Sequence, residues 1–404
     1  MFASLVLGAG PPVDLDWIRT SLLSERQTAA AQIDMVTPFF SRARSFLSRV
    51  AVALAVVVAG SAGGSSAVAA GPDAPLGTVR QQVHRAKSEL QKQVTLGDYH
   101  ASAYHPTAIV ERIHALESAA AWAELCAAFG ELADDELELF EDEVRKPDHL
   151  SRLSCAPALL RRIDAYWRAA AGRLAEAHPL SAAPAQLESI AIPVDLGRDG
   201  VFTDGLLAEG QIAITFDDGP HATRTARVLE ILRVAGVRAD FFEIGRNAAA
   251  HPEISRQVAA AGHVVGSHTF SHPDLGKLPE RHAESEIESG EASVSLALGR
   301  PVTEVPFFRF PYGAKTPAEM LFVQKRGNTT FFWNMDSQDW KIRNPHQLFL
   351  NVLQQLDRAR RGIILFHDIH EQTVIVLPHL LQELRVRGFK TVVFVPQGSV
   401  KYRD

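Results

Sequence analysis

The stretch Ile212-Ala213-Ile214-Thr215-Phe216-Asp217-Asp218-Gly219-Pro220 decides how the rest of the chain is interpreted. Its apolar first half is typical of a buried strand, and the Gly-Pro pair predicts a sharp turn into a loop. Two adjacent carboxylates at the end of a buried strand are costly unless a partner compensates them. A metal ion is such a partner, because one carboxylate can bind it while its neighbour stays free as a base. The alternative is an Asp-Asp-Gly-Pro turn without chemistry, since Asp and Gly are common in turns.

Short runs rich in Val, Ile and Phe alternate with helical stretches after Gln211. The predicted strands are 212–216, 239–244, 263–266, 305–310, 329–333, 363–366 and 391–395. The predicted helices lie near 222–235, 252–261, 279–298, 317–325, 345–360 and 374–386. This alternation is typical of a parallel sheet, and this number of strands fits a closed or nearly closed barrel. Barrel enzymes carry their chemistry in the loops that follow the strands.

A pair of histidines follows the third predicted strand, in Ser267-His268-Thr269-Phe270-Ser271-His272. Two histidines four residues apart in such a loop can turn both rings toward one ion. With Asp218 they would make a set of two histidines and one carboxylate, which holds a divalent ion and leaves positions open for water and substrate. Histidines packed in the core or exposed on the surface are the alternative.

Three further motifs follow later strands. In Arg309-Phe310-Pro311-Tyr312-Gly313, the arginine could steady a carboxylate and the tyrosine could form a wall of a sugar site. Asp336-Ser337-Gln338-Asp339-Trp340 sets an aromatic face beside a carboxylate, which suits sugar binding. The strand 363–366 leads to His367, which suits a general acid because a nearby carboxylate would raise its pKa. A structural arginine, a packed tyrosine and a tryptophan in the core are the alternatives.

The length of the chain indicates two domains, and its charge and cysteines exclude several classes of partner and site. The chain has 404 residues, 46% of them hydrophobic, and a net charge of -6, so nothing suggests a nucleic-acid partner. Cys126 and Cys155 form no Cys-x-x-Cys pair, which excludes a zinc ribbon or finger; a disulfide and two free thiols both remain open. Segment 76–187 predicts several amphipathic helices of unknown role, with the acidic run 131–143 as a solvated face and 181–185 as a linker.

The N-terminal region predicts a cleaved export signal. Arg42, Arg44 and Arg49 precede the apolar stretch 50–59, and Ala67-Val68-Ala69 fits a signal-peptidase site. The apolar stretch is too short to span a bilayer, so we expect no membrane span after cleavage; a short buried helix or a membrane tether is the alternative. Met35 would start a conventional signal, and we expect the natural start there. The expected domains are an N-terminal extension with the signal (1–70), a helical domain (71–190) and a catalytic domain (191–404).

Five motifs, taken in order, resemble those of the NodB-homology polysaccharide deacetylases, carbohydrate esterase family 4. They are Thr-Phe-Asp-Asp-Gly-Pro, Ser-His-x-x-x-His, Arg-x-Pro-Tyr, Asp-x-x-Asp-Trp and Leu-x-His. The resemblance covers 211–397 and implies an α/β fold, a distorted (β/α)7 barrel, here preceded by an all-helical segment. It implies a metal site and an acid–base pair, with Asp218, His268 and His272 as ligands, Asp217 as the base and His367 as the acid. It further implies that Arg309 sets the environment of the base, that the Tyr312 backbone N–H stabilises the oxyanion and that Asp339 tunes the acid. We assign substrate contacts to Pro311, Tyr312, Trp340 and Leu365.

The resemblance implies hydrolysis of N-acetyl groups in a polysaccharide that contains N-acetylglucosamine, such as peptidoglycan, chitin or a related cell-wall glycan, in the periplasm or outside the cell. The implied metal is Zn²⁺, with Co²⁺ as an alternative. An O-acetyl xylan esterase would share the same centre. A carbohydrate-binding domain without catalysis is disfavoured because Asp217 and His367 are both present, and a two-carboxylate glycosidase is disfavoured by the histidine pair. Neither the polymer nor the oligomeric state follows from the sequence.

Overall fold

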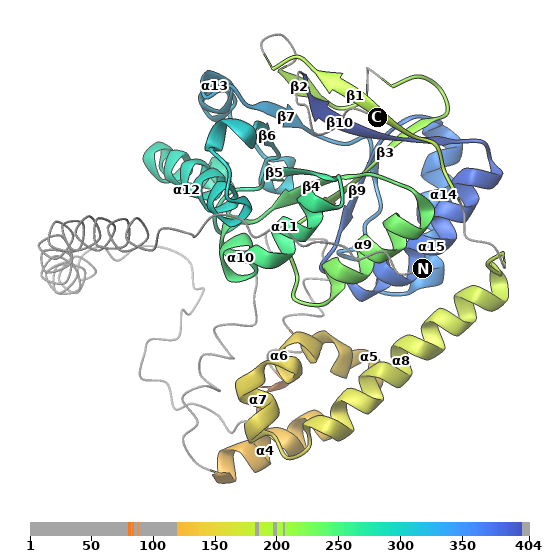
Figure 1. Cartoon of the computed structure of the whole chain (residues 1–404). Helices are drawn as coiled ribbons and strands as arrows, with labels where there is room; N and C mark the ends of the chain where they lie inside the picture. The colour runs from red at the N-terminus through yellow and green to blue at the C-terminus, as the bar shows by residue number, and fades with distance from the viewer. Residues whose placement is uncertain are drawn as a thin grey trace, which may run out of the picture. The chain divides into compact units, whose positions relative to one another are not determined.

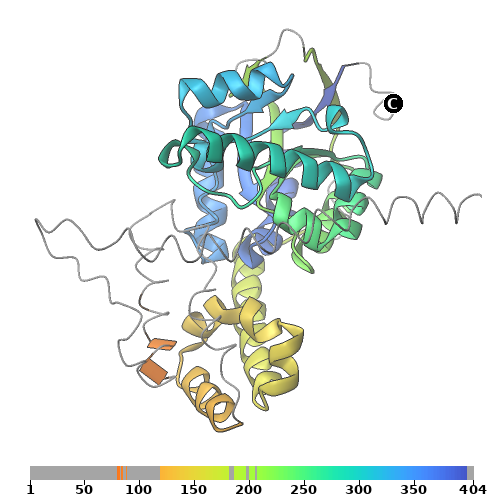
Figure 2. The same ribbon diagram turned by 90° about the vertical axis from the view of Figure 1, so that its left-hand side faces the viewer.

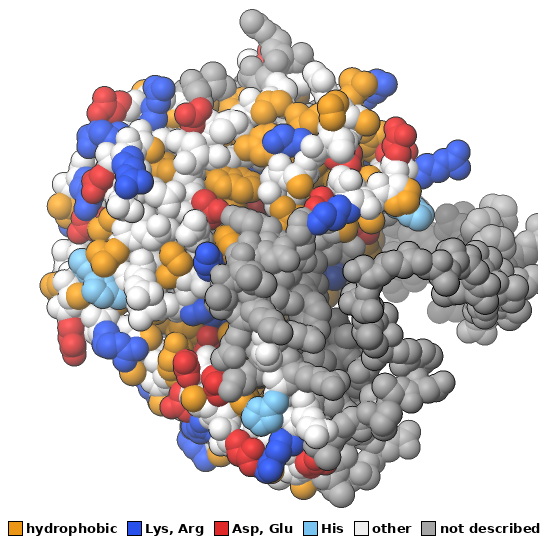
Figure 3. Space-filling model, turned by 180° about the vertical axis from the view of Figure 1, so that it is seen from behind, with side chains coloured by type: hydrophobic (Ala, Val, Ile, Leu, Met, Phe, Trp, Pro, Cys, Tyr) orange, Lys and Arg blue, Asp and Glu red, His pale blue; other side chains and the backbone are white. Residues whose placement is uncertain are grey.

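The computed structural model describes residues 119–181, 186–196, 200–204 and 207–397, together with Arg80, Gln81, Val83, His84 and Ser88. The expected export signal, the expected start at Met35 and the linker beyond Ser181 lie outside these residues. Across the described part of the chain, a helical segment precedes an α/β domain (Figure 1). None of the described helices is long and apolar enough to cross a membrane. Acidic and basic side chains are interspersed over the face seen in Figure 3, without a large block of one sign.

A parallel sheet forms the centre of the α/β domain. Its strands are β1 (Ser189–Val194), β2 (Val201–Phe202), β3 (Gln211–Asp217), β4 (Asp240–Glu243), β5 (Val264–Ser267), β6 (Phe307–Phe308), β7 (Thr329–Phe331), β8 (Met335–Asp336), β9 (Gly362–His367) and β10 (Lys390–Pro396). The order β8-β9-β3-β4-β5-β6-β7 runs through most of the sheet, and β10 and β1 extend from the start of β3. All seven predicted strands are confirmed, as is the parallel α/β fold. Three strands were missed. The strands β2 and β8 have only two residues each, which is too short for a recognisable pattern. The half-buried β1 contains Pro193, and proline disfavours the interior of a strand.

Strand β3 alternates between two apolar environments. Ile212, Ile214 and Phe216 join the core beneath the helices, whereas Ala213 joins the cluster on the other face of the sheet. Because side chains alternate along a strand, Thr215 and Asp217 share the face of Ala213. The apolar run is continuous because both faces of the strand are buried. Asp217 therefore arrives at the strand end on the inner face of the sheet, away from the helices.

The register of the sheet gathers the strand ends. Asp217 lies opposite His367 on β9, and Ser267 at the end of β5 lies opposite Phe308 on β6. The residues that follow those two strand ends are His268 and Arg309. Parallel pairing therefore brings four separate motifs to one edge of the sheet, as the sequence predicted.

Helices cover the outer side of the sheet (Figures 1 and 2). They are α9 (Arg224–Ala235), α10 (Gly245–Ala250), α11 (Pro252–Ala260), α12 (Glu280–Leu298), α13 (Pro317–Lys325), α14 (Pro345–Ala359) and α15 (Glu371–Val386). All six predicted helices are confirmed, and the short α10 was missed. Local sequence explains several ends: Asn344 caps α14 through its side chain, Thr316 forms a capping box on α13, and Gly236 closes α9 in the left-handed region.

The helical segment has its own core. It comprises α4 (Ala119–Gly130), α5 (Asp134–Leu137), the 3-10 turn η2 (Glu138–Phe140), α6 (Glu141–Arg145), α7 (Pro147–Arg152) and α8 (Ala156–Ala177). Leu125, Phe129, Ile163 and Trp167 are among the residues of this core. Cys126 on α4 and Cys155 at the start of α8 form a disulfide, which decides between the two open alternatives. The division of the chain at residue 190 stays a prediction.

The expectation of a solvated acidic face is wrong for three members of the run. Glu138, Glu141 and Glu143 are buried, whereas Asp134 and Asp135 are exposed. Glu138 pairs with Arg343 of the α/β domain, and Glu141 lies 2.9 Å from the guanidinium of Arg224. The Trp167 indole N–H also donates to Glu141 over 3.1 Å. These partners lie far away in the sequence, so the composition of the run could not reveal the burial.

We expect Glu141→Ala to lower the free energy of unfolding by about 3 kcal/mol, because the substitution leaves the buried Arg224 without part of its compensating charge. Urea unfolding followed by circular dichroism measures the change. Asp135→Ala, at an exposed position of the same run, is the control and should change the free energy of unfolding by less than about 0.5 kcal/mol. Equal effects of the two substitutions would contradict a structural role for the Glu141 pair.

Candidate active site

Asp217 and Asp218 lie side by side in the chain but have different surroundings. Asp217 ends β3, and Asp218 follows with φ +75°, a left-handed conformation that Asp tolerates better than most residues. Both are buried, each with 2% of its surface exposed. The backbone turn breaks the strand alternation, so the two carboxylates reach different partners.

Asp218 meets the two histidines of the loop after β5. One ligand atom from each of Asp218, His268 and His272 lies within 4.8 Å of the other two. The Nε2 atoms of His272 and His268 lie 3.3 and 3.7 Å from Asp218 Oδ1. That oxygen is buried and has no hydrogen-bond partner within the described ranges. A buried carboxylate oxygen without a donor is costly, and a cation at the centre of the three groups would compensate it.

The other nitrogen of each ring is already occupied. His268 Nδ1 donates to the Arg309 carbonyl over 2.7 Å, and His272 Nδ1 lies 3.1 Å from the Tyr312 hydroxyl. That hydroxyl donates to the His272 carbonyl, so it accepts from the ring. Both bonds leave Nε2 as the free lone pair toward Asp218, the tautomer that a metal requires. Burial lowers the pKa of both histidines, which keeps the rings neutral and able to ligate. The donor set therefore fits a divalent transition metal.

Asp217 is held by a fully buried arginine. Arg309 Nη1 donates to Asp217 Oδ1 over 2.7 Å and to the Thr215 hydroxyl over 2.8 Å. Its guanidinium also lies 4.1 Å from the centre of the Phe242 ring. Burial raises the pKa of Asp217 to about 6, against the opposing effect of Arg309. The second oxygen, Oδ2, lies 3.7 Å from His268 Nε2, so it faces the ligand set. A fixed carboxylate with this pKa suits a general base near neutral pH.

His367 ends β9 beside Asp217 and is oriented by Asp339. Its Nδ1 lies 2.7 Å from Asp339 Oδ1, and its backbone N–H donates to Asp339 Oδ2 over 2.7 Å. Burial disfavours the charged ring, but Asp339, Asp218 and Asp217 outweigh it and raise the pKa of His367 to about 10. His367 Nε2 lies 4.0 Å from Asp218 Oδ2. The protonated imidazole thus faces the ligand set through Nε2 and suits a general acid.

The residues assigned to substrate contacts lie around this centre with different exposure. Pro311 and Tyr312 form a short turn, η5 (Pro311–Gly313), and the Tyr312 ring packs edge-on against His272. Leu365 is buried on β9, two residues before His367 and therefore on the same face of the strand. Trp340 is half-buried directly after Asp339. Their roles toward a substrate stay predictions.

Comparison with known proteins agrees with this arrangement. A family model described as polysaccharide deacetylase matches residues 206–331. The chitooligosaccharide deacetylase of Azorhizobium caulinodans is 37% identical over 196 residues, which cover 45% of this chain and 91% of that protein.

The chain belongs to the polysaccharide deacetylase family.

Two further relatives are named as acting on peptidoglycan. The peptidoglycan-N-acetylglucosamine deacetylase PgdA of Listeria monocytogenes is 34% identical over 183 residues, 45% of this chain and 37% of that protein, so the match spans about a third of it. The solved structure of the Bdellovibrio bacteriovorus peptidoglycan deacetylase Bd3279 superposes with a TM-score of 0.69 at 27% identity and covers 81% of this chain and 98% of that chain. Because 81% exceeds the share of residues 191–404, that likeness extends into the helical segment.

Several residues that support this deacetylase site were missed at the sequence level. The Thr373 hydroxyl and the Gln372 amide donate to Asp339 over 2.5 and 2.6 Å from the first turn of α15. Asp368 is buried behind the Asp-Asp-Gly-Pro loop, and a Cβ on Gly219 would collide with its carboxylate, which explains that glycine. Polar residues in the first turn after Leu-x-His were a readable signal for Gln372 and Thr373. Nothing in the sequence pointed from Gly219 to Asp368.

The helical segment contacts the loops that follow Asp217 and His367. Arg224 is 5% exposed, and its guanidinium forms ion pairs with Glu141 and Asp142 of the helical segment at 2.9 and 2.8 Å. The same guanidinium donates to the Ile369 carbonyl over 3.1 Å, two residues after His367. The helical segment, whose role the sequence did not reveal, therefore contacts the chain that follows β3 and β9.

We expect Tyr312→Phe to weaken Zn²⁺ affinity roughly tenfold, because the hydroxyl that orients the His272 ring is lost. Isothermal titration calorimetry on metal-stripped protein measures the change. His272→Ala is the reference for loss of a ligand and should weaken binding much further. An unchanged dissociation constant in Tyr312→Phe would show that packing alone orients His272.

Proposed function

We propose that this protein is a metal-dependent hydrolase that removes N-acetyl groups from N-acetylglucosamine units of a polysaccharide and releases acetate. One observation carries the proposal: a buried three-ligand set is flanked by a base and an acid. Asp217 Oδ2 lies 3.7 Å from one ligand nitrogen, and His367 Nε2 lies 4.0 Å from a ligand oxygen. Hydrolysis of an amide needs both groups, since water must lose a proton and the amine must gain one.

Asp218, His268 and His272 would hold the metal, with Zn²⁺ as the proposed ion and Co²⁺ as the alternative. When bound, a divalent ion polarises the acetyl carbonyl and makes water more acidic. Asp217 takes a proton from the attacking water, and Arg309 keeps its carboxylate in place for that transfer. The Tyr312 backbone N–H is proposed as a donor to the oxyanion that forms on the acetyl oxygen.

His367 completes the reaction by protonating the departing amine. The pKa of about 10 keeps its ring charged at neutral pH, and Asp339 holds the ring while the C–N bond breaks. Water thus contributes hydroxide to the acetyl carbon and a proton to Asp217, the amine takes the proton of His367, and acetate and a free amino sugar result. Asp217 is free for this work because its neighbour, Asp218, is the residue that faces both histidines.

The choice of substrate is supported by the relatives, which are named for chitooligosaccharide and for peptidoglycan. We propose a glycan containing N-acetylglucosamine, encountered after export to the periplasm or the cell exterior. An O-acetyl xylan esterase is the alternative that the same centre would serve.

Acetate release from peptidoglycan, chitooligosaccharides and acetylated xylan tests the proposal. We expect release from at least one N-acetylglucosamine polymer, loss of release on chelation and recovery with Zn²⁺ or Co²⁺. Asp217→Asn should retain the metal and lose turnover by about 10²–10⁴. Release from xylan alone would favour the esterase, and full turnover by protein shown to be metal-free would contradict the proposal.

We expect His367→Ala to cripple amide hydrolysis but to affect an aryl acetate ester much less, because a phenolate leaves without a proton whereas an amine does not. The kcat/KM values of wild type and variant on both substrates measure the difference. His370→Ala, at a neighbouring histidine of the same loop, is the control. Equal losses on the two substrates would show that His367 acts in another step or only structurally.

A further inference from the structure

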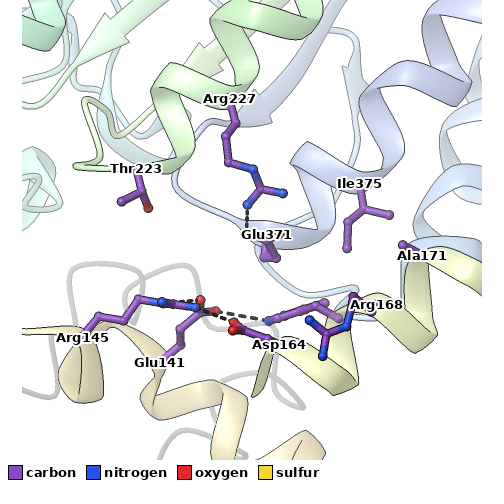
Figure 4. A pocket seen from close by; sticks show the side chains of 10 residues that line it. Glu141, Arg145, Asp164, Arg168, Ala171, Thr223, Arg227, Glu371 and Ile375 are labelled. Atoms are coloured by element: carbon purple, nitrogen blue, oxygen red, sulfur yellow. Dashed lines mark hydrogen bonds and ion pairs between the residues drawn. The ribbon is translucent and has the colours of Figure 1, made fainter. Parts of the chain in front are cut away.

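A cavity of about 400 Å³ lies where the helical segment meets the α/β domain (Figure 4). Arg145, Trp167 and Arg168 line it from α6 and α8, and Thr223, Arg227 and Glu371 line it from the start of α9 and α15. This volume lies within the range of small-ligand sites. The cavity is separate from the metal-ligand set, none of whose residues lines it.

The cavity adjoins the loops of the proposed reaction. Thr223 follows Asp218 by five residues, and Glu371 follows His367 by four. The strands that end at Asp217 and His367 pair directly with each other. The cavity therefore adjoins the loops that follow these two strand ends, so a group bound in it and the acetyl group at the proposed centre can belong to one polymer.

The charges that line the cavity leave one guanidinium unpaired. Arg145 lies 2.8 Å from Glu141 and 2.7 Å from Asp164, and Arg227 lies 2.6 Å from Glu371. Arg224 also pairs with Glu141 and Glu371, so every carboxylate of the lining has at least one arginine partner. Arg168 is exposed and has no ion pair with any residue that the structure describes.

The remaining features describe the ligand that would fit. An unpaired guanidinium binds a carboxylate through two parallel N–H donors. Trp167, buried in the wall, offers an apolar surface, and the neighbouring carboxylates can accept from peptide N–H or ammonium groups. A peptide with a free carboxylate matches this mixture, whereas an unsubstituted sugar chain has no charge for Arg168 to bind.

We propose that this cavity binds a carboxylate of a peptide attached to the glycan, so that the enzyme prefers a peptide-substituted N-acetylglucosamine polymer to a peptide-free one. The inference rests on the proposed function and narrows its substrate class to peptidoglycan. Arg168 acts in recognition and touches no reacting atom.

Two probes separate the peptide contribution: a disaccharide tetrapeptide released from peptidoglycan, and chitotetraose. Arg168→Ala should raise KM for the peptide-bearing probe roughly fivefold, the factor that a partly exposed ion pair supplies, without changing kcat. Arg168→Glu should raise it further, and added salt should shrink both effects. Neither substitution should change the kinetics on chitotetraose. Arg173→Ala, at an exposed arginine of α8 that does not line the cavity, is the matched control.

Calorimetric binding to the Zn²⁺-loaded Asp217→Asn protein separates failure of this inference from failure of the proposed function. If Arg168→Glu weakens binding of the peptide-bearing probe alone, the cavity is a peptide site even when neither probe is deacetylated. If wild type deacetylates both probes and no Arg168 variant changes either KM or affinity, the inference is overturned. Equal losses on both probes would also overturn it, because they would show a general effect on the fold.

Discussion

The burial of two adjacent carboxylates at the end of β3 is the constraint on which the α/β domain depends. Buried charges of one sign repel each other and lose their hydration, so each needs its own compensation. Arg309 compensates the charge of Asp217. Two neutral histidines lie beside Asp218, where a cation bound by all three residues would compensate its charge. Arg309 and His268 follow the ends of β6 and β5, which are joined through the pairing of Ser267 with Phe308. A slip in that register would separate both aspartates from their partners.

The same constraint separates the proposed roles of Asp217 as base and His367 as acid. Arg309 occupies Oδ1 of Asp217 and leaves Oδ2 toward the ligand set, so this carboxylate stays available for a proton. Asp339 occupies Nδ1 of His367 and leaves Nε2 toward the same set, so this ring stays charged. In both side chains, a hydrogen bond to one polar atom orients the other polar atom, Oδ2 of Asp217 or Nε2 of His367, toward the ligand set. The chemistry of the site comes from pairs of side chains, because each group alone would have a less suitable pKa or orientation.

The helical segment is joined to the α/β domain by buried ion pairs as well. Two of its buried glutamates, Glu138 and Glu141, are compensated by arginines of the α/β domain, and Arg224 also donates to the carbonyl two residues after His367. Charge pairing across this contact therefore joins the segment to the loops of the proposed reaction. The likeness to the Bdellovibrio peptidoglycan deacetylase, which extends into this segment, agrees with a shared two-part architecture. The cavity beside Arg168 is lined by residues of both parts.

The sequence by itself determined the parallel α/β fold, the long strands and helices, and the residues gathered at the strand ends. It could do so because hydrophobic periodicity and short motifs act over a few residues, and because parallel strands bring their ends to one edge. It did not determine the short strands β2 and β8, whose pairing depends on neighbours more than on their own two residues. The tertiary structure alone decided that Glu138 and Glu141 are buried, that Cys126 and Cys155 are joined, and that Gly219 makes room for Asp368. Each of these depends on a partner that lies far away in the chain, and local composition carries no information about such a partner.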